Sequence, residues 1–208
     1  MTVSDESQVI LWVLLTVSTT QSRQRYATEL NTEQTRREYK LRYAGTANDS
    51  IVDGPGLRFA IFTQGCPHGC PECHNPHTHD FNGGKTADIS YFTEKIKGNP
   101  LLDGITFSGG EPFCQAEALA AIAHEFDGTE LNIVTYTGYT FEYLLKNADS
   151  ENKYMDLLEC TDILIDGPFL KEQRSIEIRF RGSRNQRILD CRKSLELKKA
   201  VEIPEDEL

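Results

Sequence analysis

The chain has 208 residues, of which 38% are hydrophobic and 26% charged, a composition that excludes a disordered, collagen-like or membrane-embedded protein. Its 22 lysines and arginines against 32 acidic residues leave a net charge of −10. Because an acidic surface repels polyanions, we expect neither a nucleic acid nor a membrane as partner. A compact chain of this length buries about 70% of its unfolded surface, so it needs no disulfide or metal to hold its fold.

The first forty residues differ in composition from the rest. An apolar run, VILWVLLTV at residues 9–17, is far shorter than the roughly 20 residues of a membrane-spanning helix. Asp5 and Glu6 precede this run where a secretory signal carries positive charge, so we expect neither a span nor a signal. We expect residues 1–40 to be an extension, disordered or not natively translated, ahead of a domain at residues 41–208.

The expectation that translation starts after residue 1 depends on the codons that could encode residues 36–41. Arg36-Arg37-Glu38 can be encoded by a purine-rich run that resembles a ribosome-binding site. Leu41 follows at a short distance and can be encoded by the alternative start TTG. The intact mass of natively expressed protein tests this hypothesis, because a mass that includes residues 1–40 contradicts it.

From residue 39 onward, strand and helix patterns alternate. Strands are expected at residues 57–63, 104–108, 131–135 and 162–166, with weaker candidates at 176–180 and 186–189. Helices are expected at residues 89–97, around 119–126, at 141–146 and up to 155–159. This alternation predicts an α/β fold with mainly parallel strands and right-handed crossovers. Four or five such units are too few for a closed eight-stranded barrel, so an open or partial (βα) barrel is predicted.

Three of the six cysteines, Cys66, Cys70 and Cys73, lie within eight residues directly after the first predicted strand. Such crowding favours a metal site in a reducing, cytoplasmic setting over disulfides, because adjacent thiolates need a cation between them. A Zn²⁺ ion would complete its ligands with a histidine of the same loop: His74, His77 or His79. An iron–sulfur cluster would leave one iron open or take a fourth cysteine: Cys114, Cys160 or Cys191. Spacing alone does not separate the two metals.

A second motif, Ser108-Gly109-Gly110-Glu111-Pro112, follows the next predicted strand. It lies at the edge where parallel α/β folds bind their ligands. The glycines let a ligand approach the backbone closely, and Glu111 can bind an ammonium group. Alone, a Gly-Gly pair after a strand is more often only a turn. Three clustered cysteines after one strand and Gly-Gly-Glu after the following strand are far more specific together.

The combination of C-x3-C-x2-C with a downstream Gly-Gly-Glu resembles the radical S-adenosylmethionine enzymes. Residues 53–58 (DGPGLR) and Cys73-His74-Asn75 resemble the activases of glycyl-radical enzymes. Within these, the chain length and three further segments are similar to the activases of anaerobic ribonucleoside-triphosphate reductase: YTGY at 136–139, DGPF at 166–169 and RGSRNQR at 181–187. The resemblance spans residues 39–189. Glu72 departs from the aromatic residue that many radical enzymes place before the third cysteine.

The resemblance implies a mechanism. Cys66, Cys70 and Cys73 would hold a [4Fe–4S] cluster whose fourth iron binds the amino and carboxylate groups of S-adenosylmethionine. The methionine end of this cofactor would be bound by the Gly-Gly-Glu motif and the end of the cysteine loop: Gly109, Gly110, Glu111, Glu72, Cys73 and His74. Reductive cleavage would yield a 5′-deoxyadenosyl radical that attacks one glycine of the reductase large subunit, and a flavodoxin-like or other low-potential donor would supply the electron. No protein acid or base is implied as a catalytic residue.

Two other readings stay open. Within the same superfamily, the chain could be a pyruvate formate-lyase activase or a small radical enzyme similar to 7-carboxy-7-deazaguanine synthase. The former is usually longer and carries Asp-Thr-Asn-Gly where this chain has Thr135-Tyr136-Thr137-Gly138. In a different class, the cysteines and a histidine would form a zinc-stabilised binding module.

Several other residues have structural interpretations. The turn at residues 53–56 is expected to lead into a strand, and Tyr136 and Tyr139 to pack at the sheet end. A basic group is expected on a solvated face: Arg181, Arg184 and Arg187. Exposed loop histidines are expected at three positions: His68, His77 and His79. Residues 202–208 are expected to form a frayed tail.

Overall fold

A computed structural model describes residues 39–208 of the chain, and all statements below refer to these residues. The apolar run at residues 9–17 and the codon hypothesis for residues 36–38 therefore lie outside the described part. Tyr39 and Lys40 lie inside it, and Lys40 is the first residue of a strand. Within residues 39–208, the helices are too short and too polar for any of them to cross a lipid bilayer.

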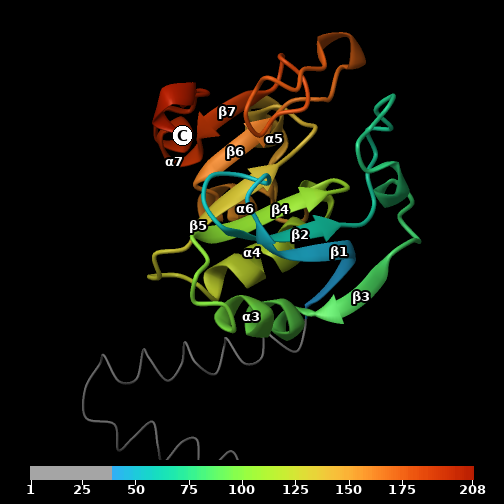
Figure 1. Cartoon of the computed structure of the whole chain (residues 1–208), viewed down its shortest axis with the longest axis vertical. Coiled ribbons are helices and arrows are strands. Elements are labelled where there is room, and N and C mark those ends of the chain that lie inside the picture. Colours follow the sequence, from blue (N-terminus) through green and yellow to red (C-terminus); the bar gives the residue numbers. More distant parts are fainter. Residues whose placement is uncertain (1–38) are drawn as a thin grey trace, which may run out of the picture. The chain divides into compact units, whose positions relative to one another are not determined.

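The described residues form one mixed seven-stranded sheet (Figure 1). Its strands, in chain order, are β1 Lys40–Ser50, β2 Arg58–Thr63, β3 Lys85–Asp88, β4 Gly104–Gly109, β5 Asn132–Tyr136, β6 Ile163–Asp166 and β7 Arg187–Asp190. They lie side by side in the order β3-β1-β2-β4-β5-β6-β7. The four central strands, β2, β4, β5 and β6, are parallel, while β1, β3 and β7 pair antiparallel with their neighbours. The fold is thus α/β with a parallel centre, as predicted.

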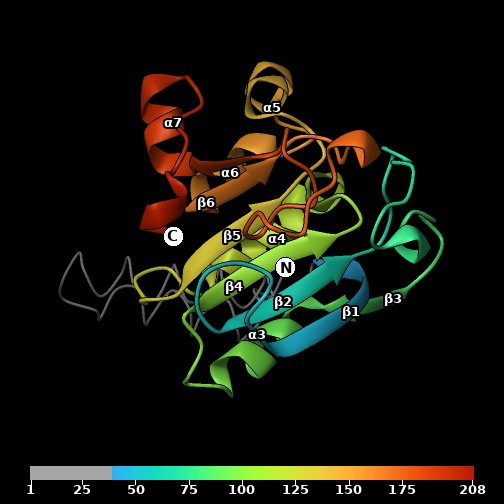
Figure 2. The same cartoon turned by 45° about the horizontal axis from the view of Figure 1, so that its top comes forward.

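Five α-helices pack on one face of this sheet (Figures 1 and 2). They are α3 Ile89–Lys97, α4 Ala116–His124, α5 Phe141–Asn147, α6 Tyr154–Cys160 and α7 Cys191–Leu197. Four short 3₁₀ helices complete the described elements: η1 Pro76–Thr78, η2 Pro112–Gln115, η3 Lys171–Gln173 and η4 Glu205–Glu207. We call this side of the sheet the helix face.

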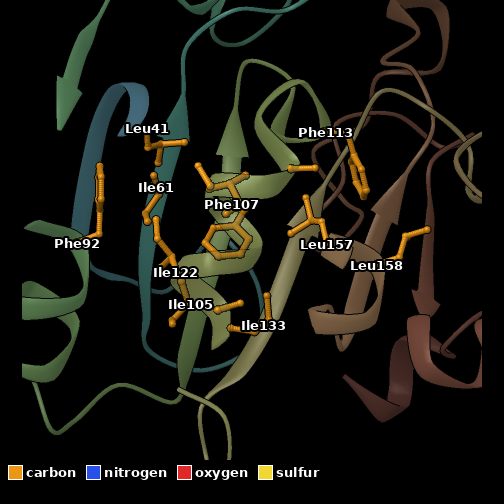
Figure 3. Packing of buried hydrophobic residues seen from close by; sticks show 14 of the residues in the cluster. Leu41, Ile61, Phe92, Ile105, Phe107, Phe113, Ile122, Ile133, Leu157 and Leu158 are labelled. Atoms are coloured by element: carbon orange, nitrogen blue, oxygen red, sulfur yellow. The ribbon is translucent and has the colours of Figure 1, made fainter. Parts of the chain in front are cut away.

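The helix face is a continuous apolar core. Because side chains alternate across a strand, every second residue of the central strands points to the helices, among them Ile61, Phe107 and Ile133. These side chains meet apolar residues of the helices, including Phe92 and Ile122, and nearly all of them are fully buried (Figure 3). Burial of each large side chain contributes about 1.5–3 kcal/mol, so this face supplies most of the stability of the domain.

The opposite side, which we call the loop face, is covered by chain without regular structure. The segment at residues 51–57, drawn in cyan, crosses the sheet in Figure 1. It is fastened by Arg58, whose fully buried guanidinium donates hydrogen bonds to the Pro55 carbonyl at 2.8 Å, to Thr106 Oγ1 at 2.6 Å and to Asn132 Oδ1 at 2.9 Å. Burial lowers the pKa of Arg58 to about 10. A second segment, residues 167–186, lies near the carboxyl ends of β5 and β6.

Two expectations for local structure are wrong, and three elements were not expected. Residues 176–180 alternate like a strand but form none, because no strand within residues 39–208 pairs with them; Ile176 is 93% exposed. Helix α7 and strands β1 and β3 were not predicted, since β1 and β3 are rich in polar residues. The acidic tail is not frayed: Ile203 donates its backbone N–H to the carbonyl of Ile188 at 2.8 Å.

Candidate functional site

The three clustered cysteines lie in the loop that follows β2. This loop is closed on itself by backbone hydrogen bonds from Gly65 N to the Thr78 carbonyl at 2.8 Å and from Cys66 N to the His79 carbonyl at 3.2 Å. The Gln64 side chain donates to the carbonyls of His77 and Asp80 at 3.0 and 2.7 Å. The loop is therefore fixed by its own polar contacts rather than by an apolar core.

Cys66, Cys70 and Cys73 are half-buried free thiols that line one cavity of about 120 Å³. The cavity lies at the carboxyl ends of the parallel strands, since Ser108 and Tyr136 at the ends of β4 and β5 also line it. Burial raises the pKa of the Cys66 thiol, and nearby Glu111 and the other two cysteines raise it further. Three thiolates here would require compensating positive charge, which iron in a cluster supplies.

Within residues 39–208, no group of three or more His, Cys, Asp or Glu side chains is placed to bind one metal ion directly. A Zn²⁺ ion would need four ligands around one point, whereas a cubane iron–sulfur cluster would bind each cysteine through a different iron. A buried His79 Nε2 atom without a hydrogen-bond partner is a further polar group in the lining of this cavity.

Glu111 is completely buried, and both of its carboxylate oxygens accept hydrogen bonds. Oε1 accepts from Phe113 N at 3.0 Å and Thr137 Oγ1 at 2.9 Å, while Oε2 accepts from Gly138 N at 2.9 Å and lies 2.6 Å from His68 Nε2. The carboxylate therefore joins the end of β5 to the cysteine loop. Its predicted contact with an ammonium group stays a prediction.

The two glycines of the motif are required by neighbouring backbone. Gly109 has a φ of +98°, and a Cβ there would lie 2.5 Å from the amide nitrogen of Thr63. A Cβ on Gly110 would lie 2.4 Å from the carbonyl oxygen of Gly65 and 3.1 Å from that of Thr78. The glycines thus let the end of β4 pack directly against the base of the cysteine loop, a role that the motif alone did not indicate.

The end of the cysteine loop reaches the segment at residues 167–186. Glu72 has a φ of +56°, unusual for a residue with a side chain, and its carboxylate lies 2.5 Å from Lys171 Nζ. The exposed ring of His74 packs against Phe169 with 5.5 Å between ring centroids. Of these three predicted cofactor-binding residues, Cys73 lines the thiol cavity, whereas Glu72 and His74 do not.

A larger cavity of about 480 Å³ adjoins the first on the loop face. Cys73, Ser108 and Tyr136 line both. The remaining wall combines aromatic and charged side chains from the two covering segments, including Asp53 and Arg181. Burial raises the pKa of Tyr136 above its ordinary value. Tyr136 is thus a cavity residue as well as a packing residue, and the clue in the sequence was its place in YTGY after a strand.

Two residues expected to be solvated are structural. His68 is bound to Glu111 and packs edge-on against Tyr139, with 4.5 Å between ring centroids, so it is not a free loop histidine. Arg187 bridges the fully buried Asp166, at 2.5 Å, and Glu142, at 2.8 Å. These hydrogen bonds raise the pKa of Arg187, which anchors β7 rather than forming a solvated basic patch. His77 is exposed, as predicted.

Comparison with known proteins adds an independent finding. Residues 52–189 match the family described as "4Fe-4S single cluster domain". The anaerobic ribonucleoside-triphosphate reductase-activating protein of Salmonella typhimurium is 30% identical over 161 residues, which cover 70% of this chain and 96% of that protein. The pyruvate formate-lyase-activating enzyme of Clostridium pasteurianum is 36% identical over 108 residues, 48% of this chain and 45% of that enzyme. Among solved structures, QueE from Escherichia coli aligns over 52% of this chain and 57% of its own, with a TM-score of 0.41 and 16% identity.

Proposed function

Because the chain belongs to the 4Fe-4S single cluster domain family and, within it, to the anaerobic ribonucleoside-triphosphate reductase-activating proteins, we propose that it generates a glycyl radical on such a reductase. It is an enzyme of the radical S-adenosylmethionine type, with a [4Fe–4S] cluster and S-adenosylmethionine as cofactors. The observation that carries the proposal is the cavity lined by three free thiols at the carboxyl ends of the parallel strands.

In this proposal, Cys66, Cys70 and Cys73 would hold three irons of the cluster, and the fourth iron would be left for S-adenosylmethionine. The reduced cluster would supply the electron for reductive cleavage of S-adenosylmethionine, and the resulting 5′-deoxyadenosyl radical would remove a hydrogen atom from a glycine α-carbon of the reductase. A flavodoxin-like or other low-potential protein delivers that electron, and the free cysteines suit a reducing cytoplasm.

The chain's own residues orient and shield the reactants. The close packing of Gly109 and Gly110 against the cysteine loop fixes the position of this loop relative to the end of β4. Glu111 joins the end of β5 to the same loop. The methionine end of the cofactor would be held by this motif together with Glu72, Cys73 and His74, and the larger cavity would hold the rest of the cofactor. We further propose that the sheet is the partial (βα) barrel of the radical S-adenosylmethionine type.

The test is an anaerobic assay of the iron-loaded protein with S-adenosylmethionine, a reductant and an anaerobic ribonucleoside-triphosphate reductase. We expect formation of 5′-deoxyadenosine and a doublet in the electron paramagnetic resonance spectrum that collapses when the reductase carries α-deuterated glycine. Cys70→Ala serves as the inactive control. Fully iron-loaded protein that yields neither product nor signal contradicts the proposal.

The assay also separates the second candidate. The pyruvate formate-lyase-activating enzyme shares less than half of its length with this chain, yet its identity over that part is 36%. A parallel reaction with pyruvate formate-lyase as the radical acceptor therefore belongs in the experiment. A signal on that enzyme alone would reassign the acceptor and leave the radical chemistry in place.

A further inference from the structure

One ring nitrogen of His79 is buried and makes no hydrogen bond within the described part of the chain. Its Nε2 atom is shielded from solvent and has no hydrogen-bond partner among residues 39–208. A buried polar atom without a hydrogen-bond partner destabilises the fold, and native proteins seldom retain one without a functional reason. The sequence had indicated only an exposed loop histidine at this position.

The backbone around His79 is fixed beside the first cysteine. The His79 carbonyl accepts the Cys66 N–H at 3.2 Å, and the preceding residue, Thr78, is fully buried and accepts the Gly65 N–H at 2.8 Å. The Thr78 hydroxyl donates to the Asn75 carbonyl at 2.7 Å. His79 therefore lines the thiol cavity from a rigid part of the loop, on the Cys66 side.

The other loop histidines do not offer this donor. His68 Nε2 already lies 2.6 Å from Glu111 Oε2, and the side chains of His74 and His77 belong to exposed residues. Sulfur is the acceptor that the cavity provides, since three cysteines line it and the proposed cluster would add inorganic sulfide. A hydrogen bond to such sulfur stabilises the more negative, reduced form of a cluster more than the oxidised form.

We propose that His79 donates a hydrogen bond from Nε2 to sulfur at the Cys66 corner of the cluster and thereby raises the cluster's reduction potential. This inference rests on the proposed function, because it requires the cluster. It gives His79 a role in setting how readily the cluster is reduced, apart from the binding of S-adenosylmethionine.

The test is a reductive titration, followed by electron paramagnetic resonance, of anaerobically prepared protein without S-adenosylmethionine. His79→Leu removes the donor and is expected to shift the midpoint potential to a more negative value. His79→Gln keeps an N–H donor at a similar reach and is expected to restore most of the parent potential. His77→Leu is the matched control, the same substitution at an exposed neighbour, and is expected to leave the potential unchanged.

Two results would overturn the inference: a potential that is indifferent to His79→Leu, or equal shifts in His79→Leu and His79→Gln. Calorimetry of S-adenosylmethionine binding to the same variants is a further measurement. If His79→Leu weakens S-adenosylmethionine binding while the potential stays unchanged, the acceptor is that cofactor and the sulfur assignment is wrong.

If His79→Leu does not assemble a cluster, a measurement on the parent protein still tests the proposed hydrogen bond. Electron nuclear double resonance of reduced protein with ¹⁵N-labelled histidine should show a coupling to the cluster that His79→Gln abolishes, and the lack of such a coupling contradicts the inference. Iron analysis keeps the two proposals separate. Parent protein without iron refutes the proposed function, whereas an active, iron-loaded protein whose potential ignores His79 refutes only this inference.

Discussion

The two faces of the sheet are built from the same strands but follow different chemistry. On the helix face, residues such as Phe59, Ile105 and Leu164 are apolar, fully buried and held by packing. On the loop face, the intervening residues Arg58 and Thr106 are also fully buried, yet they are held by hydrogen bonds. The helix face holds the large apolar core, whereas the loop face combines a small apolar cluster, Val134, Ile165 and Ile188, with buried polar groups.

This difference explains where the site lies. A dense apolar core leaves no room for a cofactor, because protein interiors are packed as tightly as organic crystals. The two adjoining cavities that contain the cysteines lie where irregular segments, rather than helices, cover the sheet, and polar side chains converge there at the carboxyl ends of the strands. Substitutions on the two faces should therefore separate stability from chemistry.

The largest separation is expected between two cysteines. Cys70→Ala should abolish cleavage of S-adenosylmethionine while leaving the thermal unfolding transition nearly unchanged, because Cys70 lies in a loop outside the apolar core. Cys191→Ala is the matched control on the helix face, where the thiol is fully buried and donates to the Leu158 carbonyl at 3.3 Å. That variant should lose stability but keep its iron and its activity. Full cleavage activity in Cys70→Ala would show that the cluster assignment is wrong.

A large effect on stability alone is expected from Phe107→Ala. Phe107 is fully buried at the centre of the helix face, so the cavity left behind should lower the free energy of unfolding by about 3–5 kcal/mol. Urea unfolding measures the change, and iron content in the absence of urea serves as the readout of the site. A loss below about 1 kcal/mol, or a loss of iron at full stability, would contradict the division between the faces.

Gly110→Ala tests the junction between β4 and the cysteine loop. Its Cβ would lie 2.4 Å from the Gly65 carbonyl oxygen, directly before Cys66, so the loop must shift to accept it. We expect reduced iron binding together with weaker binding of S-adenosylmethionine, measured by iron analysis and calorimetry. Gly128→Ala is the control, since a Cβ there would meet no atom within 4 Å, although its φ of +77° adds backbone strain. Unchanged iron and cofactor binding in Gly110→Ala would contradict this account.

The smallest effect is expected from the ion pair that anchors β7. The hydrogen bonds from Arg187 hold the pKa of Glu142 below its ordinary value. A carboxylate with a lowered folded-state pKa stabilises the fold above its unfolded-state pKa, and this contribution is lost as the pH falls through the folded-state pKa. Because Glu142 is largely exposed, Glu142→Gln should lower stability near neutral pH by at most about 1 kcal/mol, and the difference should vanish in acid. A difference that does not depend on pH would contradict the assignment to Glu142.

The sequence predicted the parallel centre of the fold well. Strands β2, β4, β5 and β6 are short apolar runs, and their pattern reports burial directly. Strands β1 and β3 escaped prediction because an antiparallel edge can be polar: β3 has the sequence KTAD and depends on its neighbour for pairing. Residues 176–180 show the converse, since an alternating pattern without a partner strand remains a loop.

For the site, the sequence indicated which segments meet but not which atoms bind which. The order of strands brings the cysteine loop and the Gly-Gly-Glu motif to one edge, as expected from parallel α/β topology. That Glu111 is saturated by four donors, and that His68 is one of them, depends on the path of the loop, which no local pattern encodes. The orphaned nitrogen of His79 is likewise visible only in three dimensions.

The central claim is that three thiols hold a cluster with one iron free for S-adenosylmethionine. It is tested most directly by metal and sulfide analysis of air-free protein, combined with electron paramagnetic resonance of the reduced form before and after S-adenosylmethionine is added. The account predicts about four irons and four sulfides per chain, with a spectrum that changes when the cofactor binds. Protein that contains zinc alone, or a cluster whose spectrum is indifferent to S-adenosylmethionine, would contradict it.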